Sequence, residues 1–198
     1  MTGLVWSPLV EAGRRDHVQV IETLLQLGDD INTQDDQGFT ALMAAAQAHN
    51  GRSINRLLSM NATMDLRNKD GSTALILACQ SNPEDNYATS LMHTPSIDFK
   101  NKEGTTALMA AADSGNERAV DRLLAANAEV DLRNNGGWTA LMFAAQKGHQ
   151  DRFDRVTQGR GYGRVERLVI HGPIVLFLFL VYNNKCSLKR VRFGCCKA

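Results

Sequence analysis

The amino-acid sequence predicts an all-α solenoid, a stack of repeated helix–turn–helix–hairpin units, and three observations support this prediction. Four glycines stand 33 residues apart, and each opens a segment of the form Gly-x-Thr-Ala-Leu followed by Met or Ile. Apolar residues at helical spacing follow these openings. Each unit then closes with a short alternating segment and a cluster of turn formers. The glycines are Gly38, Gly71, Gly104 and Gly137, and a degraded copy of the opening begins near Val5.

The unit that begins at Gly104 shows its two helices most clearly. Leu108, Ala111 and Ala112 recur at positions i, i+3 and i+4, which places them on one face of a first helix. Small residues there allow a neighbouring helix to approach closely. Gly115-Asn116 interrupts the pattern, and bulkier residues then predict a second helix. These are Val120, Leu123 and Leu124, with Ile54, Leu57 and Leu58 or Ile21, Leu24 and Leu25 in earlier units.

A hairpin is predicted after the second helix. Glu129–Arg133 alternates polar and apolar residues, as a short extended arm does, and Asn134–Gly137 is rich in turn formers. The units therefore lie near 5–37, 38–70, 71–103, 104–136 and 137–158, which together form an array over 1–158. Residues 159–198 form an atypical tail.

The third unit is predicted to be the weakest. Ser90 stands where other units have the first leucine of a Leu-Leu pair, although Asn82 and Pro83 offer a good helix start. We therefore expect Ser90→Leu to stabilise the array by about 1–2 kcal/mol.

These motifs resemble the ankyrin repeat. The matching features are the Gly-x-Thr-Ala-Leu-Met opening, the Ala-Ala pair, Gly-Asn or Gly-His between the helices, the Leu-Leu pair and a closing Asn-Ala-x-x-Asp. The resemblance covers about residues 5–157. Two departures recur: Ala replaces the usual Pro at the start of the first helix, and Met43, Ile76, Met109 and Met142 replace the usual His. We expect these four side chains to pack between repeats more readily than to contact a ligand.

The resemblance implies a non-catalytic module or scaffold that binds another protein on its hairpin tips and concave helix face. Variable residues at fixed positions are the candidates for this surface, although a solvated face without a partner would look the same. At the hairpin tips they are Asp36, Gln37, Lys69, Asp70, Lys102 and Glu103. Beside the turns they are Phe39 and Trp138, and late in the first helices they are Gln47, Gln80, Asp113 and Gln146.

Charge is distributed unevenly along the chain. Residues 160–198 hold eight of the 22 basic residues and one of the 21 acidic ones, so the tail carries +7 and the preceding body −6. An acidic body favours a protein partner with basic or mixed patches over nucleic acid as the main ligand. Cys79 is the single cysteine of the body, so no disulfide framework is expected, and a reducing, cytoplasmic location is predicted. We also expect the chain to be a monomer.

Catalytic and metal-binding constellations are not evident in the sequence. The five histidines fall at unrelated phases of the repeat, and neither Cys-x-x-Cys nor His-x-x-x-His spacing occurs. The glycines of Gly159–Gly163 lack a preceding strand pattern, so they do not predict a phosphate loop. We therefore expect no catalytic residue, cofactor or metal.

Four interpretations of the tail remain open. Its apolar run Ile174–Tyr182 could cap the last repeat, or the tail could make weak membrane-surface contact through basic residues and acylated cysteines. Lys189–Arg192 could bind nucleic acid, and the tail could be an alternative C-terminus without an evolved role. Two alternative functions accompany these: the regulatory or targeting part of a larger enzyme, and an adaptor anchored at a membrane surface by the tail.

Overall fold

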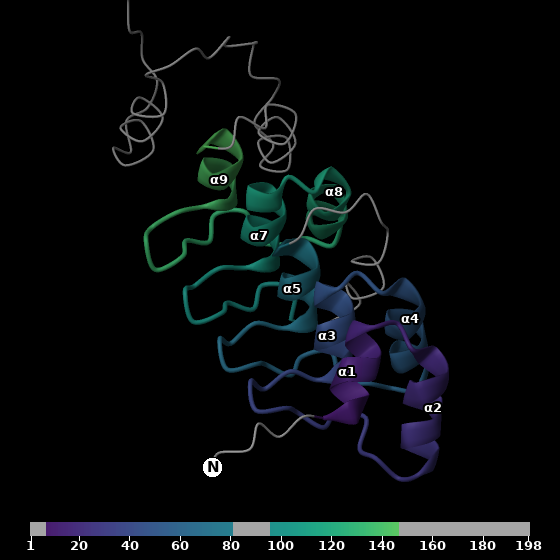
Figure 1. Ribbon diagram of the computed structural model, residues 1–198. Coiled ribbons are helices and arrows are strands. Elements are labelled where there is room, and N and C mark those ends of the chain that lie inside the picture. Colours follow the sequence, from purple (N-terminus) through teal and green to yellow (C-terminus); the bar gives the residue numbers. More distant parts are fainter. Residues whose placement is uncertain (1–6, 81–95, 147–198) are drawn as a thin grey trace, which may run out of the picture. The chain divides into compact units, whose positions relative to one another are not determined.

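The computed structural model describes residues 7–80 and 96–146, which belong to one compact unit (Figure 1). The predictions about Asn82, Pro83 and Ser90 lie outside the described residues. So do the boundary at 158 and every interpretation of the tail.

Eight helices and no strand occur in the described residues, which confirms the prediction of an all-α solenoid. The first helices of the units are α1 (Pro8–Arg14), α3 (Ala41–Gln47), α5 (Ala74–Gln80), α7 (Ala107–Ser114) and α9 (Ala140–Gln146). The second helices are α2 (Val18–Gln26), α4 (Gly51–Ser59) and α8 (Glu117–Ala125). The degraded opening near Val5 therefore leads into a complete helix pair.

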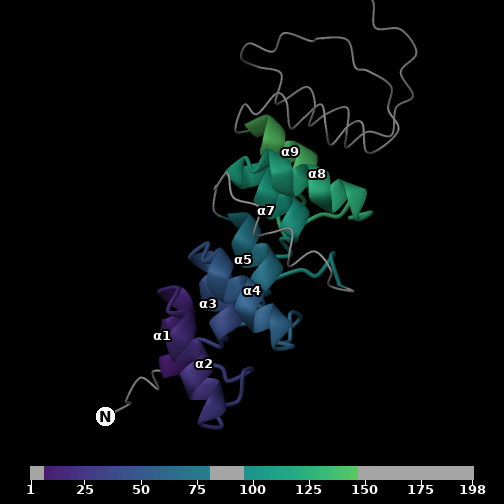
Figure 2. The same ribbon diagram turned by 90° about the vertical axis from the view of Figure 1, so that its right-hand side faces the viewer.

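The helices form two layers. The first helices pack against one another in chain order, from α1 through α3, α5 and α7 to α9, and α2, α4 and α8 each pack on the first helix of their own unit (Figures 1 and 2). The hairpins project from the side of the first helices that faces away from the second layer (Figure 1). Residues 33 apart consequently occupy equivalent places in neighbouring units.

A threonine begins each first helix after α1. The Oγ1 atom of Thr40 accepts a hydrogen bond from Met43 N at 3.2 Å, and Thr106 does the same for Met109 N at 3.3 Å. This bond satisfies an amide that the helix leaves unpaired. All four threonines of the repeated opening are buried, at 0–4% exposure, so the cap is part of the core.

Small side chains let the first helices lie close together. Ala45, Ala46, Ala111 and Ala112 are completely buried. At Gly13 of α1 the approach leaves no room for a side chain, because a Cβ atom would lie 2.5 Å from the carbonyl oxygen of Ala41. The alanine-rich face recognised in the sequence is therefore the contact between consecutive units.

Three of the four apolar residues at the position of the usual histidine belong to this core. Met43, Ile76 and Met109 are each 1% exposed, in agreement with packing between units, while Met142 in α9 is half-buried.

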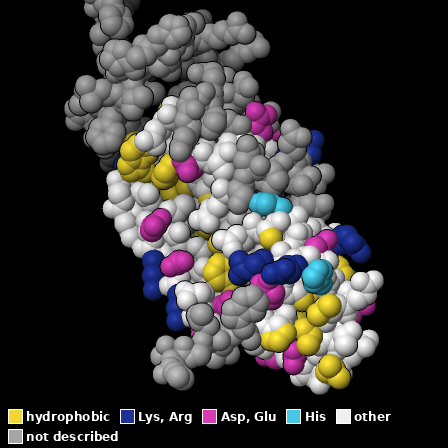
Figure 3. Space-filling model, in the orientation of Figure 1, with side chains coloured by type: hydrophobic (Ala, Val, Ile, Leu, Met, Phe, Trp, Pro, Cys, Tyr) yellow, Lys and Arg dark blue, Asp and Glu magenta, His cyan; other side chains and the backbone are white. Residues whose placement is uncertain are grey.

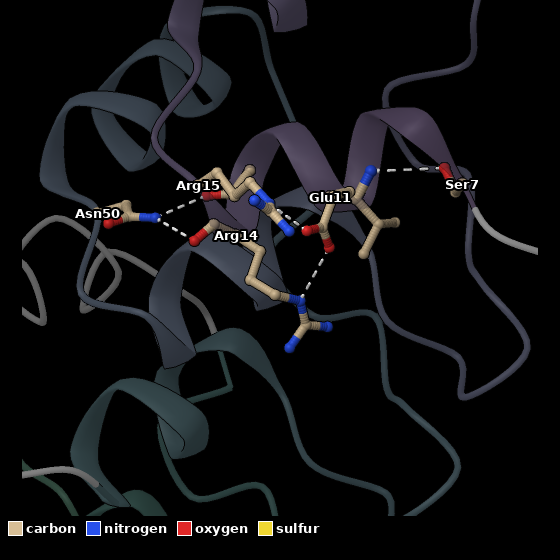
Figure 4. A network of polar contacts seen from close by, with 7 residues as sticks. Ser7, Glu11, Arg14, Arg15 and Asn50 are labelled. Atoms are coloured by element: carbon tan, nitrogen blue, oxygen red, sulfur yellow. Dashed lines mark hydrogen bonds and ion pairs between the residues drawn. The ribbon is translucent and has the colours of Figure 1, made fainter.

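Polar side chains join the first two units at the C-terminus of α1 (Figure 4). Asn50 Nδ2 donates to the carbonyl oxygens of Gly13 at 2.9 Å and Arg14 at 2.8 Å, which lie in the last turn of the helix, where carbonyl groups lack the regular helical hydrogen bond. The carboxylate of Glu11 in α1 pairs with Arg14 and with Arg15, the residue that follows the helix. The two bonds of Asn50 hold the start of α4 against the end of α1.

Cys79 is expected to be chemically inert in the folded chain. It is fully buried in α5, and desolvation raises the pKa of its thiol from 9.0 to about 12. The reactive thiolate is therefore scarce. In a chain whose Cys186, Cys195 and Cys196 are replaced by Ser, a thiol-specific chromogenic reagent should react slowly before unfolding and promptly afterwards.

The same burial makes stability depend on pH. The thiol has the lower pKa in the unfolded chain, so the unfolded state loses its proton first. The contribution of Cys79 to the free energy of unfolding is present below about pH 9 and is lost as pH rises towards 12. A Cys79→Ala variant should lack this alkaline component, and equal alkaline slopes in urea titrations of both chains would contradict the assignment.

Candidate functional site

Each hairpin is closed by the side chain of one Asx residue. In the second of these turns, Asn68 Oδ1 accepts hydrogen bonds from Asp70 N at 3.0 Å and Ser72 N at 2.8 Å. Two backbone hydrogen bonds close the same turn: Asn68 N donates to Ser72 O at 3.1 Å, and Gly71 N donates to Asn68 O at 2.9 Å. Asp35 and Asn101 make the equivalent pair of side-chain bonds, and Asn134 Oδ1 accepts one from Trp138 N. The turn therefore keeps its shape whatever residues stand at its tip.

The tips are joined from unit to unit by backbone hydrogen bonds. Lys69 N donates to Gln37 O at 2.9 Å, and Lys102 N donates to Asp70 O at 2.8 Å. Asn135 N continues the series to Glu103 O at 2.9 Å. We call this series the tip ladder. It fixes the register of neighbouring hairpins through main-chain atoms.

Replacing Asn101 tests the side-chain closure. Asn101→Ala should lower the free energy of unfolding by about 1–3 kcal/mol, because the amides of Glu103 and Thr105 lose their acceptor. Asn101→Asp should lower it much less, since Asp35 makes the same two bonds in the first hairpin. Urea unfolding followed by circular dichroism measures both, and equal losses would show that the carboxamide has another role.

The structure brings the predicted tip residues together along one edge of the array. Gln37, Lys69, Asp70, Lys102 and Glu103 are exposed there. Asp36 lies at the same edge, is half-buried and makes polar interactions. Basic and acidic side chains are interspersed along this edge, on the left of Figure 3. The edge is a polar surface of mixed charge on a fixed backbone.

The two aromatic candidates lie beside the turns and pack within the fold. The guanidinium of Arg14 lies over the ring of Phe39, with 5.8 Å from Arg14 Cζ to the ring centroid. The rings of Trp138 and Phe143 are 5.4 Å apart between centroids and tilted by 42°. Both candidates are half-buried, so each combines internal packing with an accessible edge.

The candidates late in the first helices form a second row. Gln47, Gln80 and Gln146 are exposed at the C-termini of α3, α5 and α9, and Asp113 is half-buried in α7. Because the first helices pack in order, this row runs in the same direction as the tip ladder.

A third row was not recognised in the sequence. Gln34, Arg67, Lys100 and Arg133 stand 33 residues apart and are all exposed on the hairpin arms. Gln34 Nε2 donates to Arg67 O and Lys100 Nζ donates to Arg133 O, each at 2.9 Å. Arg67 Cζ lies 4.2 Å from the ring centroid of Phe99. The 33-residue spacing could have revealed this row. That its side chains contact the following unit can be seen only once the units are stacked.

The described part of the chain offers neither a metal site nor a membrane-spanning helix. Within 7–80 and 96–146, no group of three His, Cys, Asp or Glu side chains could hold a metal ion. None of the helices in these ranges combines the length and hydropathy required to cross a bilayer.

Comparison with known proteins identifies the repeats. The sequence model of the family described as ankyrin repeats (3 copies) matches residues 9–98 and 85–154. A search of curated proteins found no significant match.

Proposed function

This chain belongs to the ankyrin repeat family, whose members are generally protein–protein interaction modules, and we propose that its array binds another protein along the hairpin tips and the adjoining ends of the first helices. The partner would lie across several units and contact the tip row and the row that includes Gln47 and Gln80. Binding of this kind involves no catalytic step, cofactor or metal. We further propose that the chain acts as a cytoplasmic monomer.

The tip ladder supports this proposal most directly. Main-chain bonds such as Lys69 N to Gln37 O fix the edge, while the side chains of Gln37, Asp70 and Glu103 are exposed. The backbone of the binding surface is therefore preorganised, so binding costs less free energy for ordering it than binding to a flexible loop would.

Site-specific photocrosslinking tests the surface. A benzophenone amino acid would be placed in the full chain at Gln37, Asp70 or Glu103, one position on each of three tips. Matched positions on the second helices are Gln26, Arg52 and Arg122, which are also exposed. Phe39 and Trp138 are left intact because both rings pack within the fold.

The expected result is a crosslinked protein partner from the tip positions and little or none from the second helices. Crosslinks of equal yield from both sets, or from the second helices alone, would contradict the proposed surface.

A further inference from the structure

The hairpin arms carry a stripe of positive charge on a body whose net charge is negative. Exposed Arg67 and Lys69 alternate with half-buried Leu66 and buried Asn68, which places both cations on the outer side of the arm. The next unit repeats the pair as Lys100 and Lys102, and the last contributes Arg133. We call the set Arg67, Lys69, Lys100, Lys102 and Arg133 the basic stripe.

Contacts within and between hairpins hold three of the five side chains of the stripe in place. Arg67 is fixed over Phe99 of the next hairpin, and Lys100 Nζ is bound to Arg133 O. Arg133 Nη1 donates to Gly137 O at 3.0 Å. An Arg side chain has five N–H donors and a Lys three, so a single contact does not use all the donors of either residue type. For the side chains held by these contacts, part of the rotamer entropy that binding would cost is already lost.

Acidic residues flank the stripe. Asp70 and Glu103 follow the cations at the tips, and Asp65, Asp98 and Asp131 precede them on the arms. A ligand charged at every position, such as the phosphate backbone of a nucleic acid, would meet these carboxylates as well as the cations. A ligand whose charges are spaced to match the stripe would meet the cations alone.

The repeat sets that spacing. Neighbouring hydrogen-bonded arms lie about 4.8 Å apart, and each unit contributes two arms, so equivalent cations recur about every 10 Å. A peptide in the extended polyproline II conformation has three residues per turn and rises about 3.1 Å per residue, so its every third side chain lies on the same side at about 9 Å, close to the interval of the stripe. We propose that the basic stripe binds an extended acidic protein segment that carries Asp or Glu at every third residue and runs across the hairpins.

This inference rests on the proposed function and names the partner's chemistry. It departs from the expectation, based on the net charge of the body, that the partner is basic or mixed, because the local charge of the arms has the opposite sign. The crosslinking experiment and the peptide-binding experiment can fail separately. If the crosslinked partner has no acidic segment, the proposed protein-binding surface stands, but the basic stripe is not the site that binds it.

The test measures fluorescence anisotropy of labelled peptides with the full chain at low and at physiological salt. One peptide repeats Asp-Ser-Gly, so that Asp recurs at every third position, and a second has the same composition with its Asp residues consecutive. The stripe variant is Lys69→Glu/Lys102→Glu, whose side chains are exposed at the tips. The control is Arg52→Glu/Arg122→Glu, which changes the net charge equally on α4 and α8. The basic tail is the same in all three chains, so its contribution cancels in the comparison.

The stripe variant should bind the spaced peptide about 20-fold more weakly than the original chain at low salt, and the control should change by less than about 2-fold. The consecutive-Asp peptide should bind more weakly than the spaced one. Lys69→Gln/Lys102→Gln should give an intermediate loss, and circular dichroism should show the same helix content in every chain. The proposal would be overturned by equal losses in the stripe and control variants, by equal binding of the two peptides, or by tighter, stripe-dependent binding of an oligothymidylate of similar length.

Discussion

Gly104→Ala is expected to lower the free energy of unfolding by about 2–4 kcal/mol, one of the two largest effects of a single substitution that we anticipate. Gly104 has a φ of +78°, a conformation that costs an alanine about 1–2 kcal/mol. A Cβ atom would also lie 2.8 Å from Asn135 N and 3.0 Å from Asn134 Cα. These backbone atoms belong to the next hairpin and cannot move without breaking the tip ladder.

Gly137→Ala separates the two causes. Gly137 has the same φ of +78° at the same place in its turn, but its Cβ would have no atom of the described residues within 4 Å. We expect this control to lose about 1–2 kcal/mol, the cost of the backbone conformation alone. Urea unfolding of the full chains, followed by circular dichroism, gives both values. Equal losses would mean that the contact between hairpins contributes nothing to stability.

Leu123→Ala is expected to cost about 2–5 kcal/mol, the range for emptying a fully buried leucine site. Leu123 in α8 is completely buried, as is Leu57 at the equivalent place in α4. The second leucine of each pair is only half-buried, so Leu124→Ala should cost less than half as much. The same unfolding experiment compares the two variants. A larger loss for Leu124→Ala would reverse the assignment of the core leucine.

The repeated positions were the part of the fold that could be predicted from the sequence. The 33-residue spacing located the first helices, because the Thr-Ala-Leu opening recurs without an insertion. The Ala-Ala pair indicated a close helix contact, and Ala111 and Ala112 are completely buried. The spacing alone did not distinguish the two leucines of each pair, since which one faces the neighbouring unit depends on how the helices stack.

The candidate surface was predicted less completely. Variability at fixed positions indicated the tip row, and its residues lie along one edge of the array. The basic stripe was missed because the net charge of −6 averages over the whole body and hides the local sign of the arms. The tip ladder was beyond sequence reasoning, since its bonds join main-chain atoms of different units and depend on no side chain at the tips.

That independence gives the tip ladder an evolutionary consequence. The atoms that hold neighbouring hairpins in register are present in every amino acid except proline, which lacks the donor. Residues such as Gln37, Asp70 and Glu103 can therefore be exchanged with little penalty to folding, while the Asx and glycine positions on either side of them cannot. New specificity can accumulate at the tips one substitution at a time, without compensating changes in the core, so the array is open to adaptation where a partner would meet it.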